Sequence, residues 1–149
     1  MSDTDIAKVA WAAGFIDGEG CIHIMKQKFN SGKNGEIKYS HILRVHIAQN
    51  NLEVLEYLRE VLGLHGNIHK LRRTIDTNRQ GYTLNYSSSH AFELVKLIKP
   101  YLIRKLPEAE AVVAFWKEGK LDMRTGRKSL PQKIWGIRER WYRKLKRMK

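Results

Sequence analysis

The chain has one cysteine, Cys21, among its 149 residues. A single cysteine excludes an intramolecular disulfide framework and a zinc ribbon, because both need several. The six histidines show no paired ligand spacing, and the chain contains no H-E-x-x-H pattern of a zinc protease. No apolar run approaches the length of a transmembrane helix, so we expect no membrane partner. Residues 2–5 are polar and acidic, so we expect no signal or transit peptide, which leaves the cellular location open.

Acidic residues are scarce relative to basic ones. The chain holds 28 Lys and Arg against 15 Asp and Glu, a formal net charge of +13. A charge this large on a small protein indicates a polyanionic partner, and nucleic acid comes first. Hydrophobic residues make up 42% of the chain, which argues against disorder. The length predicts one domain over residues 1–149, with room for a core.

The basic excess is concentrated near the end of the sequence, where residues 117–149 hold thirteen Lys and Arg against three acids. Pro131 suits a first helical turn and predicts a basic helix over about residues 131–146. One face of this helix carries an apolar stripe of Ile134, Trp135, the Arg138 stem, Trp141 and Leu145. We expect that face to dock on the protein, while Arg140, Arg143 and Lys144 contact DNA phosphates. A merely solvated basic face is the alternative.

A stretch of small residues predicts a second distinctive helix, over about residues 8–18. Side chains three and four positions apart share one helix face. Small residues on such a face let another helix backbone approach closely. The residues of this face are Ala10, Ala13, Gly14 and Asp17.

The end of this helix carries an acid between two glycines. Gly18 and Gly20 are expected to end the helix and to leave Glu19 at its tip. The tip is the negative end of the helix dipole, with unpaired backbone carbonyls beside it. A carboxylate next to such carbonyls, including that of Gly18, predicts a cation site. A helix cap with a solvated Glu is the alternative.

Two pairs of alternating segments predict two β-hairpins, over residues 21–27 and 38–49 and over residues 67–73 and 82–87. In each hairpin one face is apolar and the other polar, and the polar face is either a wet sheet face or a DNA-reading surface. A two-stranded ribbon fits the DNA major groove, where polar side chains reach base edges. The candidates for DNA contact are His23, Gln27, Ser40, Arg44, His46, His69, Arg73, Thr83 and Asn85.

Helices are predicted between and after the hairpins. A leucine stripe predicts a helix over residues 52–62, ended by Gly63 and begun by a capping pair of Asn50 and Glu53. Ser88 or Ser89 can begin a helix that reaches Ile98, and Pro107 opens another. The resulting order is helix, two strands, helix, two strands, helices.

Residues 12–20, with the sequence A-A-G-F-I-D-G-E-G, resemble the LAGLIDADG motif of homing endonucleases. Ala12 stands at the first Leu of that name and Glu19 at its second Asp. The resemblance implies an α+β fold with an αββαββα core, in which a saddle-shaped antiparallel sheet lies on DNA. It implies a Mg²⁺-dependent double-strand break in a long, pseudo-palindromic target, with Mn²⁺ or Ca²⁺ able to occupy the same site.

The resemblance also implies roles for single residues. Glu19 and the Gly18 carbonyl would bind the metal ion, and Gln49 would help to order the attacking water. Lys105 would lie near the scissile phosphate. Cys21 has no evident base beside it, so we expect a small packing residue there.

Only one copy of the motif is present. In this family one motif implies a homodimer, so the face of Ala10, Ala13, Gly14 and Asp17 would meet its copy at a two-fold axis. Two hypotheses stay open: a homing endonuclease, or a non-cutting binder on the same scaffold, either an intron RNA maturase or a transcription regulator. Glu19 favours the enzyme, because a pure binder gains nothing from a carboxylate at the phosphate backbone.

Overall fold

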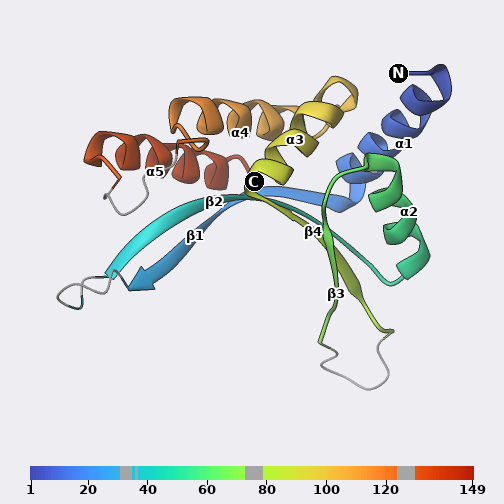
Figure 1. The fold of residues 1–149 in the computed structure, drawn as a ribbon, viewed down its shortest axis with the longest axis horizontal. Helices are drawn as coiled ribbons and strands as arrows, with labels where there is room; N and C mark the ends of the chain where they lie inside the picture. Colours follow the sequence, from blue (N-terminus) through green and yellow to red (C-terminus); the bar gives the residue numbers. More distant parts are fainter. Residues whose placement is uncertain (31–34, 36, 73–78, 124–129) are drawn as a thin grey trace.

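The structure, a computed structural model, describes residues 1–30, 35, 37–72, 79–123 and 130–149. It has the predicted α+β fold, with an αββαββα core followed by further helices (Figure 1). The elements are α1 (Asp3–Glu19), β1 (Gly20–Asn30), β2 (Ile37–Gln49), α2 (Leu52–Leu62), β3 (Asn67–Lys70), β4 (Tyr82–Ser87), α3 (Ser88–Ile98), the 3-10 turn η1 (Lys99–Tyr101), α4 (Leu106–Glu118) and α5 (Gln132–Arg147).

The four strands form one antiparallel sheet in the order β1-β2-β4-β3. The sheet arches, and its two hairpins bend away from the helices at opposite ends (Figure 1). Helices α3, α4 and α5 lie over the convex side, which leaves a concave face uncovered by helices. This arch is the saddle that the family resemblance implies.

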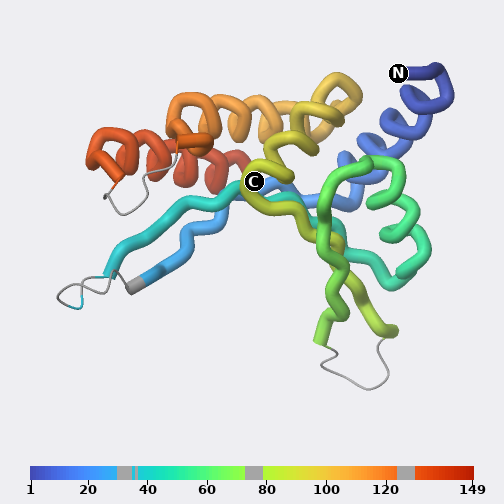
Figure 2. The backbone as a smooth tube through the Cα atoms, viewed as in Figure 1, coloured from blue at the N-terminus to red at the C-terminus, as the bar shows by residue number. Residues whose placement is uncertain are grey.

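The core lies between the convex side of the sheet and the helices. Alternate residues of β1, β2 and β4, among them Ile22, Val45 and Leu84, are buried against α3 and α4. The period of two along each strand therefore sends most apolar side chains to the helices and most polar ones to the concave face. Figure 2 shows that α5, from the end of the chain, runs beside α4 and β1, to which it contributes the buried Leu145.

The motif helix α1 is longer than the predicted span of about residues 8–18. It begins at Asp3 because Ser2 and Asp5 form a capping box, in which the Asp5 amide donates to Ser2 Oγ at 3.1 Å. It continues through Gly18 and ends at Glu19, with Gly20 as its cap. A Cβ on Gly20 would lie 2.8 Å from Ile16 Cγ2, so the turn from α1 into β1 requires a glycine.

Two further boundaries differ from the prediction. Asn51, not Asn50, caps α2 and accepts a hydrogen bond from the Val54 amide at 3.1 Å. Strand β3 ends at Lys70 rather than near residue 73, and beyond it the side-chain amide of Gln80 donates to the Leu71 carbonyl at 2.8 Å. Over the described residues, none of the helices has the length and apolar character needed to cross a membrane.

Candidate functional site

The tip of α1 carries the candidate catalytic acid. Glu19 is the last residue of the helix, and its side chain is exposed. Its Oε2 accepts a hydrogen bond from Nε2 of Gln49, the last residue of β2, at 3.2 Å. The end of one helix and the end of one strand therefore place a carboxylate and an amide side by side.

Lys105 lies at the same tip because it is hydrogen-bonded to Asp17. The Lys105 Nζ donates to the Asp17 carbonyl oxygen at 2.6 Å, and its backbone amide donates to Asp17 Oδ1 at 2.8 Å. The backbone amides of Ile103 and Arg104 donate to Asp17 Oδ2 at 3.3 and 3.0 Å. Asp17 thus fixes the turn before α4 against α1, and that turn sets the position of the lysine.

These contacts keep the Asp17 carboxylate ionised. Burial raises its pKa, but the three backbone amides and the charge of Lys105 outweigh burial, so the pKa lies below its usual value. Asp17 is fully used by these contacts within its own chain, which leaves Glu19 as the exposed carboxylate of the motif. The three predicted catalytic residues, Glu19, Gln49 and Lys105, all lie at this end of α1.

Polar side chains of all four strands share the concave face of the sheet. The strand register arranges them in rows that cross the sheet, and most are half-buried, while Gln27, Asn67 and His69 are exposed. Arg73 lies outside the described residues. The rows are Gln27–Ser40, His23–Arg44–Ser87, Cys21–His46–Asn85–Asn67 and Ala48–Thr83–His69.

The sequence reasoning missed three residues of this face, namely Cys21, Asn67 and Ser87. Cys21 was expected to be a small packing residue, and its position in β1 puts it on the polar face, opposite His46. Cys21 and His23 are two residues apart on one strand, so their side chains leave the same face. This spacing is the signal that could have placed Cys21 there.

One buried donor on the concave face lacks an acceptor among the residues that the structure describes. The Nε atom of Arg44 is buried and has no hydrogen-bond partner among the described residues. Burial and the neighbouring charges of His46, Lys149 and Arg44 lower the pKa of His23 to about 4. Burial, with Lys149 and Arg44, also lowers the pKa of His46. Both imidazoles are therefore neutral at pH 7, and each can donate or accept a hydrogen bond.

Two residues of the predicted dimer face point into their own chain, which corrects that part of the prediction. Ala13 is 0% exposed in the core, and the Asp17 carboxylate is bound to the turn before α4. A helix has several faces, and the three- and four-residue spacing did not show which one the sheet would cover. Ala10 is half-buried and Gly14 is exposed.

The outward side of α1 carries an aromatic cluster instead. Trp11 is 41% exposed, and its ring centroid lies 5.6 Å from that of Phe15 and 5.3 Å from that of Tyr57 on α2. Tyr57 is itself 44% exposed. Exposed aromatic rings beside Gly14 form a surface of the kind that protein–protein interfaces use.

The basic helix α5 lies on the side of the sheet away from the concave face (Figure 1). Its docked side follows the predicted stripe, since Leu145 is buried and Trp135 Nε1 donates to the Tyr39 carbonyl at 3.1 Å. The three predicted phosphate-binding residues have contacts within the chain. Arg143 Nε donates to Glu139 at 2.9 Å, Arg140 lies 3.7 Å from Glu118, and Lys144 stacks over Trp141.

Comparison with known proteins gives the same fold and motif. Residues 12–117 match the LAGLIDADG endonuclease family. The probable intron-encoded endonuclease Cox1-I1b of Schizosaccharomyces pombe is 40% identical over 62 residues, which are 40% of this chain and 15% of that protein. The chain therefore spans a small part of that relative's length.

Two solved structures share the fold at low sequence identity. The homing endonuclease I-CvuI, in complex with the I-CreI target in the presence of magnesium, is 21% identical with a TM-score of 0.63. The match covers 97% of this chain and 98% of that one. The I-LtrWI LAGLIDADG homing endonuclease bound to target DNA is 19% identical with a TM-score of 0.65, over 90% of this chain and 42% of that one. The family match covers the second half of α1 with its acidic tip, both hairpins and nearly all of α4, and this chain belongs to the LAGLIDADG endonuclease family.

Proposed function

We propose that this protein is a homing endonuclease that makes a site-specific double-strand break in DNA. The observation that carries the proposal is the exposed Glu19 carboxylate at the tip of α1, with Gln49 and Lys105 beside it. The concave polar face of the sheet supplies a surface for the duplex, and the net charge of +13 favours a polyanion. Of the structures that share this fold, that of I-CvuI contains the I-CreI target and that of I-LtrWI contains target DNA.

The donor atoms at this tip fit a hard divalent cation. Glu19 offers carboxylate oxygens, and the last carbonyls of a helix, such as that of Gly18, lack partners within the helix. An all-oxygen donor set suits Mg²⁺, and Mn²⁺ or Ca²⁺ can take its place. When bound, such an ion supplies charge to the scissile phosphate and makes a bound water more acidic.

The protein side chains have separate tasks around that ion. Gln49 holds the Glu19 carboxylate by its amide and can orient a water with its remaining hydrogen-bonding capacity. Lys105, held at the Asp17 carbonyl, brings a positive charge to the same tip. An ammonium fixed there can stabilise the negative charge that develops on the phosphate oxygens.

A double-strand break needs two such tips, and we infer that two copies pair along α1. The exposed Gly14 and the aromatic cluster of Trp11, Phe15 and Tyr57 lie on its outward side. The chain matches 98% of I-CvuI but 42% of I-LtrWI, as expected for one copy of a unit that longer relatives carry twice. A symmetric pair would place two Glu19 side chains near one axis.

The substitution Glu19→Gln tests the enzyme against the non-cutting binder. The variant keeps the size of the side chain but loses the charge that a cation needs. We expect cleavage of a selected target in Mg²⁺ to fall at least about 100-fold, an effect typical of losing a catalytic group, while binding in a gel-shift assay persists. Targets are first selected from a randomised duplex library for cutting by the native protein.

Glu56→Gln is the matched control, because Glu56 is an exposed acid on α2. It should cut as the native protein does. Full cleavage by Glu19→Gln would remove Glu19 from the mechanism. A native protein that enriches bound duplexes but cuts none with Mg²⁺ or Mn²⁺ would support the maturase or regulator instead.

A further inference from the structure

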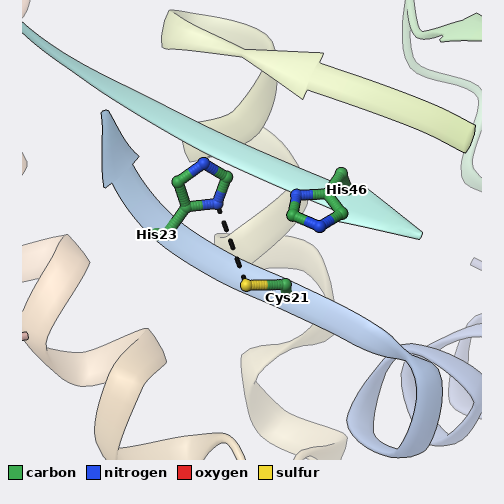
Figure 3. Close-up of side chains that lie close together, drawn as sticks. All are labelled: Cys21, His23 and His46. Atoms are coloured by element: carbon green, nitrogen blue, oxygen red, sulfur yellow. Dashed lines mark hydrogen bonds between the residues drawn. The ribbon is translucent and has the colours of Figure 1, made fainter. Parts of the chain in front are cut away.

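Three side chains with nitrogen and sulfur donors meet on the concave face of the sheet, beyond the tip of α1. They are Cys21, His23 and His46, and their potential ligand atoms all lie within 4.8 Å of one another. Figure 3 shows the Cys21 sulfur and the two rings on the same side of β1 and β2. The Cys21 Sγ lies 3.9 Å from His23 Nδ1, and the two imidazole centroids are 5.1 Å apart.

The strand register produces this arrangement. Cys21 and His23 are two residues apart on β1, so both side chains leave the same face. His46 on β2 is the direct cross-strand partner of Cys21, and directly opposed Cβ atoms lie about 4.5–5.5 Å apart. Two adjacent hydrogen-bonded strands therefore hold the three donors on a rigid support.

We propose that Cys21, His23 and His46 form a zinc site. A thiolate and two imidazoles suit a borderline-soft ion such as Zn²⁺ rather than Mg²⁺, which prefers oxygen. Nitrogen ligands of tetrahedral zinc lie about 3.3–3.4 Å apart and a sulfur and a nitrogen ligand about 3.6 Å apart, from the usual Zn–N and Zn–S lengths. Small side-chain rotations bring the three donors to that spacing, and the Cys21 thiol proton leaves to solvent on binding.

Two positively charged side chains border this site, and their charges disfavour the binding of a metal cation there. Lys149 Nζ donates to the Cys21 sulfur at 3.2 Å, and Arg44 is the cross-strand partner of His23. The Lys149 side chain is exposed, so its ammonium can withdraw into solvent when an ion takes the thiolate. Zinc binding then replaces one cation at the sulfur with another.

Three protein ligands leave one coordination position open on the concave face. A consequence that rests on the proposed function is that zinc occupies His23 and His46, two of the side chains that would read bases. Zinc should therefore weaken specific DNA binding. Elsewhere in the described chain the rings of His65, in the loop after α2, and His90, in the first turn of α3, lie 5.4 Å apart, without a third donor. That pair provides a control.

The test is a titration of metal-free protein with Co²⁺, in excess Mg²⁺ to occupy oxygen sites and without DNA. Cobalt reports a thiolate ligand by a sulfur-to-cobalt charge-transfer absorption, and Zn²⁺ should abolish that absorption by displacement. We expect one ion per chain. Cys21→Ser should lose the absorption. His23→Ala and His46→Ala should each weaken binding by more than the roughly 10–100-fold that loss of an outer-shell partner costs. His90→Ala should bind as the native protein does.

Circular dichroism of each variant shows whether it is folded, and glutamine at the same position replaces any alanine variant that is not. Native protein without the charge-transfer absorption, or equal loss of affinity in His90→Ala, would overturn the site. A separate gel shift measures DNA affinity with and without Zn²⁺. We expect zinc to weaken native binding at least fivefold and to leave Cys21→Ser unchanged. If cobalt binds but zinc does not weaken DNA binding, the metal site stands and its coupling to DNA is overturned. This outcome does not depend on whether the protein cleaves DNA.

Discussion

Arg44 stands out on the concave face because its guanidinium is half-buried and its Nε has no hydrogen-bond partner among the described residues. A buried donor without an acceptor is costly, so such a group is usually satisfied by a ligand or water. Its neighbours across the sheet are His23 and Ser87, which belong to the same polar row. A guanine edge offers the two acceptors that a guanidinium can bind together.

Arg44→Ala should therefore relax base preference at one position of each half-site. The expected loss of discrimination is about 1–3 kcal/mol at that position. Arg143→Ala is the control, because Arg143 lies on α5 and is bound to Glu139. It should weaken binding to all sequences alike, if at all. Sequencing the survivors of a randomised site library cut by each variant measures both effects, and a changed preference in Arg143→Ala alone would refute the assignment.

Residues differ in how well their positions follow from the sequence. Glu19, Gln49 and Lys105 were placed by the motif and by resemblance, and the structure brings all three to one helix end. Asp17 was assigned to the dimer face from its spacing along the helix. Such spacing does not reveal the long-range partners of a side chain. Its contacts to the turn before α4 span more than eighty residues, which no local pattern encodes.

At the scale of the secondary-structure elements, one buried acid, Glu139, holds helix α5 in place. The carboxylate accepts hydrogen bonds from His41 Nε2 at 2.9 Å, Lys26 Nζ at 3.2 Å and Arg143 Nε at 2.9 Å. Lys26 and His41 belong to β1 and β2, so this acid ties α5 to the sheet. Burial raises the pKa of Glu139, but the three donors outweigh it and lower the pKa from 4.5 to about 2.

Glu139→Gln should lower the free energy of unfolding at pH 7 by about 1.5–3 kcal/mol, the usual worth of a hydrogen bond to a charged group. Because the folded pKa is below the unfolded one, the native carboxylate stabilises the protein above pH 4.5, and that contribution is lost as the pH falls toward 2. The gap between native and variant should therefore shrink in acid. Urea unfolding at pH 7 and pH 3 measures it.

Glu118→Gln provides the comparison, because Glu118 of α4 faces Arg140 of α5 at 3.7 Å in an exposed pair. An exposed pair contributes about 0–1 kcal/mol at either pH. Equal effects of the two substitutions would show that Glu139 does not anchor α5.

The elements themselves were largely predictable, because strand alternation and helix stripes are local. The apolar stripe of α5 correctly predicted which side docks, including Leu145 and Trp135. The role of Glu139 was not foreseen, because a lone acid in a basic helix looks solvated until β1 and β2 are placed beneath it. The early start of α1 was missed because the polar residues 2–5 were considered only as evidence against a signal or transit peptide and not as a helix cap.

At the scale of the whole molecule, the arched sheet exposes its polar face on one side and α1 ends at the edge of that face. The αββαββα order followed from the sequence, and the arch followed from the family resemblance rather than from any residue pattern. Pairing of two copies stays a prediction. It depends on the single motif, on the exposed Gly14 and on the aromatic cluster around Trp11.

Gly14→Leu tests this pairing most directly. A Cβ at Gly14 meets no atom within 4 Å in the single chain, so the substitution leaves the fold intact and removes a helix-destabilising glycine. In a close crossing of two α1 helices the same side chain would force the backbones apart, at about 1–3 kcal/mol for overpacking in each copy. Gly136→Leu is the control, because Gly136 on α5 is equally open.

Sedimentation velocity of the two variants and the native protein, with cleavage of the selected target on the same samples, is the decisive measurement. If two α1 tips act together on one duplex, the native protein and Gly136→Leu sediment as dimers and cut both strands. Gly14→Leu then sediments as a folded monomer and loses double-strand cutting. A Gly14→Leu protein that stays dimeric and cuts both strands at the native rate would contradict the pairing of the Glu19 tips.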